Sequence, residues 1–403
     1  MDLPGVPSSV LEALLGAARS LSIPRLALVG GVVRDQLLHQ RGGRVWSGVP
    51  DLDWVVEGDA AALVAELGRQ LGSERISGVQ EHGAFGTVAF QLDGIPLDLA
   101  TARLEHYPAP AQNPVVRAGT LQADLARRDF TINAMALDLV AGELIDLHHG
   151  QEDLASGQLR FLHAGSVQDD PTRVIRAARY AARLGFQLAQ ESRAQIRSTV
   201  EQWPWSWRQG DAATTAPPAL ATRLRMELER LLEREPWPQA LDLLEQWQSL
   251  PLLDSQLQND PRRTQRLRWA QRLGLPLMPA LLLGAVDPVA VAQRLQIQGK
   301  QQQWLQQCGA LCDWLLDGTP SLESSPSVWS RALEQQGWQP EAVALAVTLR
   351  PQQWKPLLRW WGRWRRIQAP QTAHDLIAAG WQPGPAIGEE LRRQRSAAQD
   401  RSR

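Results

Sequence analysis

The sequence is poor in cysteine, in long apolar runs and in lysine, and these shortages narrow the class of protein. Its only two cysteines, Cys308 and Cys312, are too few for a disulfide framework. They lie four residues apart in a stretch with helical spacing, and no nearby His completes a zinc site, so we interpret them as small apolar residues. The longest apolar stretch, residues 277–286, is about half a membrane span and contains Pro279.

The N-terminal residues and the overall composition predict a folded, cytoplasmic protein. No basic segment followed by an apolar run opens the chain, so we expect no secretory signal and no membrane partner. A content of 44% hydrophobic and 21% charged residues is typical of globular proteins. No repeat of fixed period and no obligate protein partner is evident.

The formal net charge of −1 gives no sign of a nucleic-acid partner, but charge and tryptophan are unevenly distributed. Residues 1–150 carry 11 basic and 18 acidic side chains, whereas residues 350–403 carry 11 basic and 4 acidic ones. Nearly all cations are arginines, and only two of the 17 tryptophans lie before residue 200. This asymmetry predicts an acidic and a basic part with different tasks.

Apolar periodicity divides the chain into a mixed first part and a helical remainder. Short apolar or alternating runs predict strands at residues 26–29, 51–56, 85–91 and 95–100, the last two around the turn Asp93-Gly94. Residues 106–120 are rich in Pro, Gly and polar groups and predict a loop. Strand signals almost vanish after residue 150, where helical spacing dominates.

We therefore expect an α+β head followed by an all-α remainder. The predicted parts are a head at residues 1–150, a helical neck at 151–235, a helical body at 236–349 and a basic helical tail at 350–403. Within the neck, residues 203–218 (WPWSWRQGDAATTAPP) predict an exposed insertion without a functional explanation.

A glycine pair followed by two carboxylates is the first motif with chemical meaning. Gly30-Gly31 lies between a predicted strand and helix, where the backbone can approach a phosphate, and Arg34 follows one turn later. Asp51 and Asp53 lie two residues apart on a strand, so both carboxylates face one side and suit Mg²⁺. Asp98 is either a further carboxylate of this site or a structural residue.

Two later motifs are rich in arginine. Arg127 to Ala134 (RRDFTINA) predicts a loop that enters a helix, and its arginines, Asp129 and Asn133 suit phosphate and ribose recognition. Asp169-Asp170-Pro171 predicts a helix start. It precedes three arginines at three-residue spacing, which alone is typical of a solvated face: Arg173, Arg176 and Arg179.

Five motifs in this order resemble those of bacterial class II tRNA nucleotidyltransferases, the CCA-adding enzymes, and their poly(A) polymerase relatives. They are LVGGVVRDQLL, DLDWVV, RRDFTINAMAL, IDLHHGQEDL and DDPTRVIRAARYAARLGF. The resemblance is dense over residues 25–185, continues at 222–232 and 372–391, and is weak over 236–370. Asp169 and Thr222 depart from the pattern, since glutamate is commoner at both positions.

The resemblance implies a polymerase-β-like head and assigns a role to each motif. Asp51 and Asp53 would hold two Mg²⁺ ions and carry out catalysis. The implied nucleotide-binding residues are Gly30, Gly31, Arg34, Arg128, Asp129 (near the ribose), Asn133, Asp170, Arg173, Arg176 and Arg179. Asp170 and Arg173 would read the incoming base, because a carboxylate accepts from the exocyclic amine that C and A share. Arg183 would be merely solvated.

The function implied is template-independent addition or repair of the 3′-terminal CCA of tRNA from CTP and ATP, with release of pyrophosphate. An A-adding or CC-adding enzyme and a poly(A) polymerase stay open, and a non-catalytic tRNA-binding protein is more distant. The stretch between Asp98 and Arg127 is long enough for a loop that C-only relatives tend to lack, which disfavours CC-only addition. In the tail, Arg363, Arg365 and Arg366 alternate with tryptophans and are candidate RNA contacts.

Two short motifs that contain histidine, His374-Asp375 and His148-His149, do not predict metal sites. His374-Asp375 resembles part of an HD phosphohydrolase site, but it has no other histidine after His163 to complete one. His148-His149 lies in a D-x-x-x-G-x-x-D-L stretch that we interpret as the hinge between head and neck.

Overall fold

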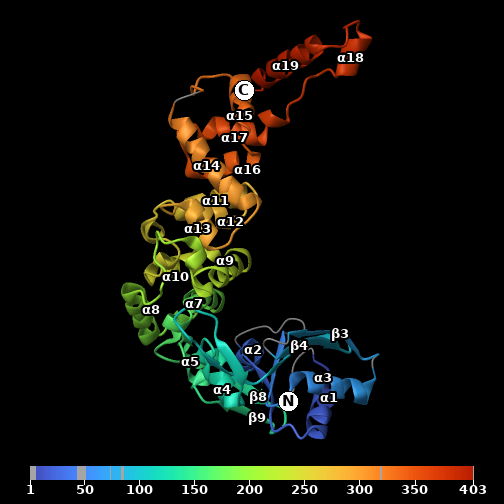
Figure 1. The fold of residues 1–403 in the computed structure, drawn as a ribbon, viewed down its shortest axis with the longest axis vertical. Coiled ribbons are helices and arrows are strands. Elements are labelled where there is room, and N and C mark those ends of the chain that lie inside the picture. The colour runs from blue at the N-terminus through green and yellow to red at the C-terminus, as the bar shows by residue number, and fades with distance from the viewer. Residues whose placement is uncertain (1–5, 43–50, 73, 83–85, 318–319, 403) are drawn as a thin grey trace. The chain divides into compact units, whose positions relative to one another are not determined.

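The structure is a computed structural model that describes residues 6–42, 51–72, 74–82, 86–317 and 320–402 (Figure 1). Phe85, the predicted start of a strand, lies outside the described residues. The chain forms two compact units. Unit 1 is Met1–Arg208, Pro217–Glu227 and Glu235–Ser249, and unit 2 is Gln209–Ala216, Leu228–Arg234 and Leu250–Arg403. The four parts predicted from the sequence stay a prediction.

A seven-stranded mixed sheet forms the centre of unit 1. In spatial order its strands are β3 (Ile76–His82), β4 (Thr87–Leu92), β5 (Ile95–Thr101), β2 (Leu52–Val56), β1 (Leu26–Val29), β8 (Met135–Asp138) and β9 (Glu143–Asp146). β2 and β5 are parallel and the other neighbours are antiparallel. The turn between β4 and β5 has positive φ at Asp93 (53°) and Gly94 (78°), as the sequence predicts for a tight hairpin.

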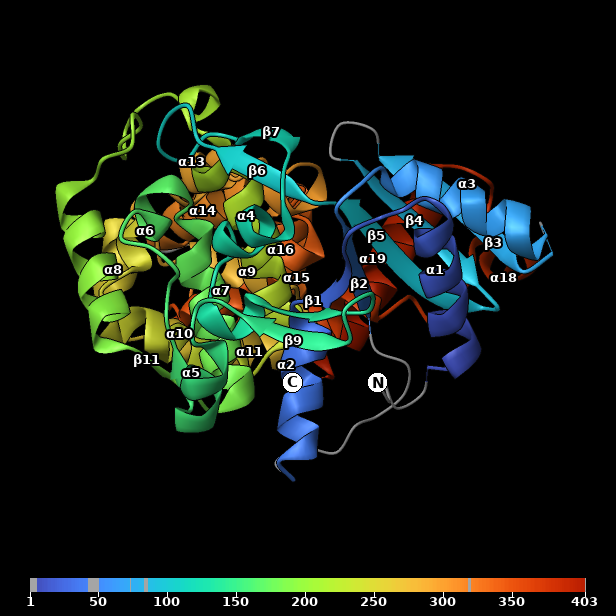
Figure 2. The same cartoon turned by 90° about the horizontal axis from the view of Figure 1, so that it is seen from below.

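Helices cover both faces of the sheet, so its strands bury alternate residues on each side. α1 (Ser8–Ser20) packs against α3 (Ala60–Leu71), which contacts β3, β4 and β5 (Figure 2). On the other face α4 (Leu121–Ala126) buries Leu121 and Leu125 against a cluster that includes Val29 and Val55. Because side chains alternate along a strand, Asp53 lies on the same face as Val55, the face that α4 covers.

Two expectations for the head are wrong. The predicted loop at residues 106–120 contains a strand, β7 (Val115–Ala118), which pairs with β6 (Arg103–His106). Gly119 permits this hairpin's close return, because a Cβ there would lie 2.8 Å from the Leu104 nitrogen. The RRDFTINA motif enters a single 3₁₀ turn, η2 (Thr131–Asn133), and then strand β8 rather than a helix.

The rest of unit 1 is mainly helical. Its elements are α2 (Gly31–Gln40), α5 (Gly150–Ser156), β10 (Gln158–Leu159), α6 (Ser166–Asp169), α7 (Thr172–Leu184), β11 (Gln187–Leu188), α8 (Gln190–Gln202), η4 (Pro218–Leu220) and α10 (Trp237–Gln246). Helix α9 (Thr222–Arg234) has its first part in unit 1 and the remainder in unit 2.

Unit 2 consists of helices throughout its described residues. They are η3 (Ala213–Thr215), η5 (Leu250–Leu252), η6 (Ser255–Asn259), α11 (Arg263–Arg272), α12 (Leu277–Leu282), α13 (Pro288–Arg294), α14 (Lys300–Leu316), α15 (Pro326–Gln335), α16 (Pro340–Leu349), α17 (Trp354–Gly362), η7 (Trp364–Arg366), α18 (Ala373–Ala378) and α19 (Pro385–Asp400). None of the helices described in either unit is long and apolar enough to span a membrane.

Some of the tryptophans of unit 2 lie in its core. Trp329, Trp360 and Trp364 are buried, so the last two are unavailable for stacking on RNA bases. Cys308 and Cys312 are free thiols in α14, which confirms that they form no disulfide.

The exposed insertion predicted at residues 203–218 is only partly confirmed, because most of residues 208–215 are exposed but the tryptophans that precede them are not. Trp205 and Trp207 are buried within unit 1, and the rings of Trp203 and Trp205 meet edge to face at 5.0 Å. Aromatic burial of this extent stabilises the surrounding helices.

Candidate active site

The predicted carboxylates and the glycine turn meet at one edge of the sheet. Asp53 on β2 is paired in register with Asp98 on the parallel strand β5, so their side chains project from the same face. Gly30 has a φ of +75°, and a Cβ there would lie 3.0 Å from Arg128 Nη1 and 3.9 Å from Asp53 Oδ2. The glycine turn, a guanidinium and a carboxylate therefore converge, and a side chain at Gly30 would separate them.

The electrostatics of Asp53 favour a cation. Crowding by protein atoms raises the pKa of Asp53 although the residue as a whole is exposed, and Arg128 opposes this effect. The negative charges of Asp98 and Asp51 raise the same pKa further. The negative charges of these three carboxylates repel one another, and a bound cation would relieve that repulsion.

A carboxylate that sequence reasoning missed holds the RRDFTINA arginines. Asp124 is fully buried in α4, and its two oxygens pair with Arg127 Nη2 at 2.6 Å and with Arg128 Nη2 at 3.0 Å. Burial alone would raise the pKa of Asp124, but the charges of Arg128 and Arg127 outweigh it and hold this pKa below its usual range. The i,i+3 and i,i+4 spacing in ADLARR was the available signal.

A buried hydrogen-bond chain joins three of the motifs. Arg34 Nη1 donates to Asn133 Oδ1 at 2.7 Å, and Asn133 Nδ2 donates to Asp129 Oδ1 at 3.0 Å. Arg176 Nε donates to Asp129 Oδ2 at 2.8 Å. Burial would raise the pKa of Asp129, but the charge of Arg176 and the hydrogen bond from Asn133 hold it below its usual range. The guanidinium of Arg34 is thus engaged within the protein.

Tyr180, a second residue that the sequence did not single out, lies at the centre of the arginine cluster. The guanidinium carbons of Arg34, Arg176 and Arg183 lie 5.1, 5.7 and 5.4 Å from its ring centroid. An aromatic face attracts cations and so lets several arginines share one small region.

Two glutamates complete this cluster from the α9 region. Glu227 pairs with Arg176 at 3.3 Å and with Arg179. Glu235 accepts from Arg179 Nη2 at 3.2 Å and from Arg183 Nε at 2.9 Å. The solvated role expected for Arg183 is therefore wrong, because its guanidinium pairs with a buried carboxylate 52 residues later.

The predicted base-reading residues are buried and held by their surroundings. Asp170 Oδ1 accepts from the Thr172 nitrogen and hydroxyl at 3.1 and 2.6 Å, and Oδ2 pairs with Arg223. Arg173 Nη2 donates to the Arg127 carbonyl at 2.8 Å and Nη1 lies 3.3 Å from His163 Nε2.

His163 can accept that hydrogen bond because burial, followed by the charge of Arg173, lowers its pKa and keeps the ring neutral. The Arg173 guanidinium is thus held from more than one side. Asp170 and Arg173 therefore have fixed positions at the start of α7.

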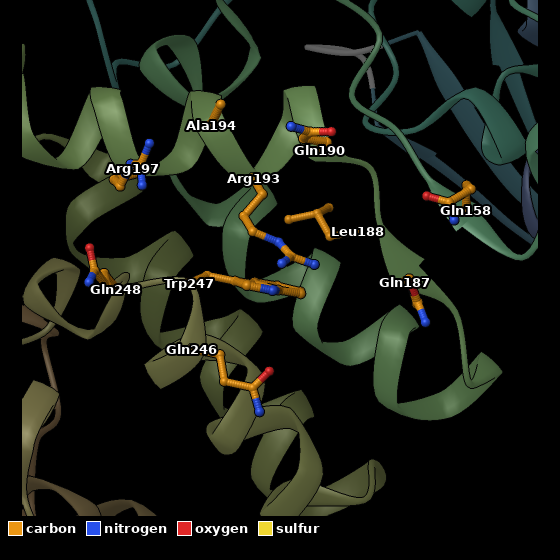
Figure 3. A pocket seen from close by; sticks show the side chains of 10 residues that line it. All are labelled: Gln158, Gln187, Leu188, Gln190, Arg193, Ala194, Arg197, Gln246, Trp247 and Gln248. Atoms are coloured by element: carbon orange, nitrogen blue, oxygen red, sulfur yellow. The ribbon is translucent and has the colours of Figure 1, made fainter.

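A small pocket lies beside Arg173. Its volume is about 380 Å³, and its lining includes Tyr107, Arg127, His163, Asp169 and Arg173. Burial and the nearby charge of Asp170 raise the pKa of Tyr107, so its hydroxyl stays protonated. A larger pocket of about 590 Å³ lies between α8 and the end of α10, where Arg193 extends toward Trp247 (Figure 3). None of the predicted site residues lines that larger pocket, so residue chemistry rather than cavity size locates the site.

The aspartates of the two histidine-containing motifs cap helices. Asp146, which precedes His148-His149, accepts from the Gly150 nitrogen at 2.7 Å and from the Gln151 nitrogen at 2.9 Å, and so caps α5. Asp375 forms a capping box with Thr372 at the start of α18. Among the residues described, no group of three or more His, Cys, Asp or Glu side chains is arranged as a metal site.

Sequence comparisons identify the family. Residues 26–160 match the family model described as poly A polymerase head domain. The chain is 35% identical over 384 residues to the CC-adding tRNA nucleotidyltransferase of Deinococcus radiodurans, which covers 91% of this chain and 82% of that protein. It is 40% identical over 171 residues to the A-adding tRNA nucleotidyltransferase of Halalkalibacterium halodurans, over 41% of this chain and 38% of that relative.

Solved structures show the same fold along almost the whole chain. A CCA-adding enzyme in complex with CTP superimposes with a TM-score of 0.70 at 25% identity, over 98% of this chain and 92% of that one. The Thermotoga maritima CCA-adding enzyme complexed with tRNA has a TM-score of 0.67 at 23% identity, over 98% and 93% of the two chains. With its mixed-sheet head and helical remainder, the chain belongs to the class II CCA-adding enzyme family and is a nucleotidyltransferase.

Proposed function

We propose that this protein completes or repairs the 3′-terminal CCA of tRNA, using CTP and ATP and releasing pyrophosphate. The observation that carries the proposal is the convergence of Asp53, Arg128 and the Gly30 turn at the sheet edge. A triphosphate would bind between the N-terminus of α2, which has no side-chain cap, and the guanidinium of Arg128. Its α-phosphate would then lie near Asp51 and Asp53.

The donor set at this edge fits Mg²⁺. Asp51 and Asp53 offer hard oxygen ligands on one face, and burial, followed by the nearby charges of Asp98 and Asp51, raises the pKa of Asp53. Asp98 stands next to Asp53 and supplies additional negative charge. Two bound Mg²⁺ ions would activate the RNA 3′-hydroxyl and stabilise charge on the α-phosphate and the leaving pyrophosphate.

The remaining residues orient the nucleotide. Arg128, which is held by Asp124, is proposed to bind phosphate, and Asp129 is proposed to accept from a ribose hydroxyl, as the family resemblance implies. Asp170 accepts from the exocyclic amine of C or A, and Arg173 donates to a ring or carbonyl acceptor. G and U present no such amine at that position, so no nucleic-acid template is needed. Arg176 and Arg179 support this arrangement through their pairs with Glu227.

Tail arginines of unit 2 are proposed to bind the tRNA body. Arg363 and Arg366 are exposed, and within the described residues neither forms an ion pair. Arg365 is half-buried and donates to the Trp361 carbonyl at 2.6 Å. Replacing Arg363 and Arg366 by Glu should raise the KM for tRNA and flatten its salt dependence, with the KM for CTP unchanged. An unchanged KM for tRNA would refute this contact.

The deciding experiment offers four RNAs to the purified protein. They are tRNA ending at the discriminator base, at C and at CC, and an oligo(A), each with labelled CTP or ATP and Mg²⁺. Addition of both nucleotides in order supports CCA synthesis, whereas long ATP-dependent tails on oligo(A) support a poly(A) polymerase. Asp53→Ala should abolish incorporation while tRNA binding persists, and substantial residual turnover would refute its role as a ligand.

CC addition alone is the second candidate. A CC-adding relative, that of Deinococcus radiodurans, matches 91% of this chain, whereas the A-adding relative of Halalkalibacterium halodurans matches 41%. The argument against CC-only addition was a loop expected between Asp98 and Arg127. That stretch contains the β6–β7 hairpin, which weakens the argument. Incorporation of CTP on the tRNAs that end at the discriminator base and at C, with no incorporation of either nucleotide on the tRNA that ends at CC, would establish this alternative. We also propose that the protein acts in the cytoplasm, where tRNA maturation needs it.

A further inference from the structure

The tryptophan-rich segment at residues 203–208 touches the peptide that leads into the base-reading site. Trp205 is 3% exposed, and its indole Nε1–H donates to the Gln168 carbonyl at 2.9 Å. Gln168 lies in α6, two residues before Asp170. The tryptophan therefore fixes a carbonyl in the short turn that ends at the base-reading carboxylate.

The next carbonyl in this turn, that of Asp169, is held by the loop between β6 and β7. The Ala111 nitrogen, at the tip of the β6–β7 hairpin, donates to the Asp169 carbonyl at 3.1 Å. The Ala111 carbonyl in turn accepts from the Ala219 nitrogen at 3.1 Å, directly after the insertion. The Gln168 carbonyl is thus held by Trp205, and the Asp169 carbonyl is held by Ala111, which is itself bonded to Ala219.

α6 also bears on the second base-reading residue. The Ser166 carbonyl, in the first turn of α6, accepts from Arg173 Nη1 at 3.4 Å. Its backbone nitrogen bonds to His163, whose ring also faces Arg173. A shift of α6 would therefore move the partners of Arg173 and the backbone of Asp170 together.

We propose that Trp205 is a positioning residue for base selection, which acts on Asp170 and Arg173 through α6. This inference rests on the proposed function, because it assigns nucleotide choice to those two residues. Trp205 touches no substrate. Its indole N–H anchors α6 so that the carboxylate and the guanidinium meet C or A in a fixed geometry, and a looser geometry admits the wrong base more readily.

Trp205→Phe tests this anchor, and Trp203→Phe is the matched control. Trp205→Phe keeps an aromatic ring but removes the N–H that reaches α6. Trp203→Phe removes an N–H of the same cluster that donates to the Trp207 carbonyl at 2.5 Å instead. Discrimination is the ratio of kcat/KM for CTP to kcat/KM for UTP on tRNA that lacks CCA.

Trp205→Phe should lower this discrimination about 5- to 10-fold, the effect of losing one buried hydrogen bond. The loss should arise mainly from a higher KM for CTP with kcat little changed, and amides of residues 166–173 should exchange faster with deuterium. Trp203→Phe should change neither quantity. Equal discrimination in the two variants, or unchanged exchange in residues 166–173, would overturn the inference. Failure of the unmodified protein to incorporate CTP or ATP would overturn the proposed function instead, while hydrogen exchange would still decide whether Trp205 anchors α6.

Discussion

Asp124→Asn is the most informative single change, because one buried carboxylate serves both the stability of the head and the position of Arg128. The replacement keeps the shape of the side chain but removes its charge. Asp124 pairs with Arg127 at 2.6 Å and with Arg128 at 3.0 Å. The amide of Asn has only one oxygen and places its NH₂ group against the other arginine, so one of these two pairs loses its acceptor. Breaking a buried ion pair by removing one partner typically costs about 3–5 kcal/mol.

The expected loss lies below that range because the arginines are not fully buried. The side chains of Arg127 and Arg128 are 18% and 17% exposed, so water can solvate part of each charge. Arg127 also keeps its pair with Glu105 at 2.9 Å. We therefore expect a loss of about 2–3 kcal/mol in the free energy of unfolding. At roughly 2–4 °C per kcal/mol for a unit of this size, the melting temperature should fall by about 5–10 °C.

The same change has a defined pH dependence. The pKa of Asp124 is lower in the folded than in the unfolded protein, so its contribution is complete above about pH 4, the unfolded value. The contribution disappears as the pH falls through the lower folded pKa. The difference in stability between the unmodified protein and Asp124→Asn should therefore be constant near neutral pH and shrink below pH 4.

Urea unfolding between pH 7 and pH 3.5, followed by circular dichroism, measures this difference. Asp93→Asn is the control, since Asp93 forms a comparable pair with Arg75 at 2.6 Å on the surface and its loss should leave stability almost unchanged. The KM for CTP should rise about 10-fold in Asp124→Asn, because Arg128 loses its anchor. A loss of stability no greater than that of Asp93→Asn, at every pH, would refute the reasoning.

Three further substitutions test other parts of unit 1. Gly30→Ala should reduce nucleotide incorporation at least 100-fold, since its Cβ would lie 3.0 Å from Arg128 Nη1, and should also lower the melting temperature, because the φ of +75° strains an alanine; activity within 3-fold of the unmodified protein would contradict this. Glu235→Ala should cost about 2–3 kcal/mol in urea unfolding, because it removes the buried carboxylate that Arg179 and Arg183 share, while Arg179 keeps its pair with Glu227 and water solvates part of the Arg183 charge; a cost below 1 kcal/mol would argue against that pairing. Gly150→Ala should cost about 1–3 kcal/mol through overlap of the new Cβ with the Thr131 carbonyl oxygen, whereas Gly309→Ala, in open space on α14, should be neutral or stabilising; equal stability of the two variants would contradict the overlap.

Sequence reasoning selected the metal candidates because their arrangement is local, whereas the base-reading candidates came from the resemblance to a known family. Asp51 and Asp53 share a face since a strand repeats every two residues, and a glycine pair between strand and helix marks a backbone that can approach phosphate. Helical periodicity likewise predicted the helical remainder of the chain. The same method failed at β7, which forms a hairpin with β6, and after RRDFTINA, where β8 pairs with β1 more than 100 residues earlier.

The sequence by itself therefore determined the family, the mixed head, the helical remainder and the order of the motifs. Only the tertiary structure decided which charges are paired and which tryptophans are buried. Arg34 and Asn133 are 99 residues apart, and Arg179 and Glu235 are 56 apart, so no local spacing links them. The physical reason is that chain geometry fixes a residue's face over a few positions, whereas ion pairs and burial depend on which elements pack together. Trp205 illustrates the difference. The composition of residues 203–218 predicted an exposed insertion, but the packing of the elements buries Trp205.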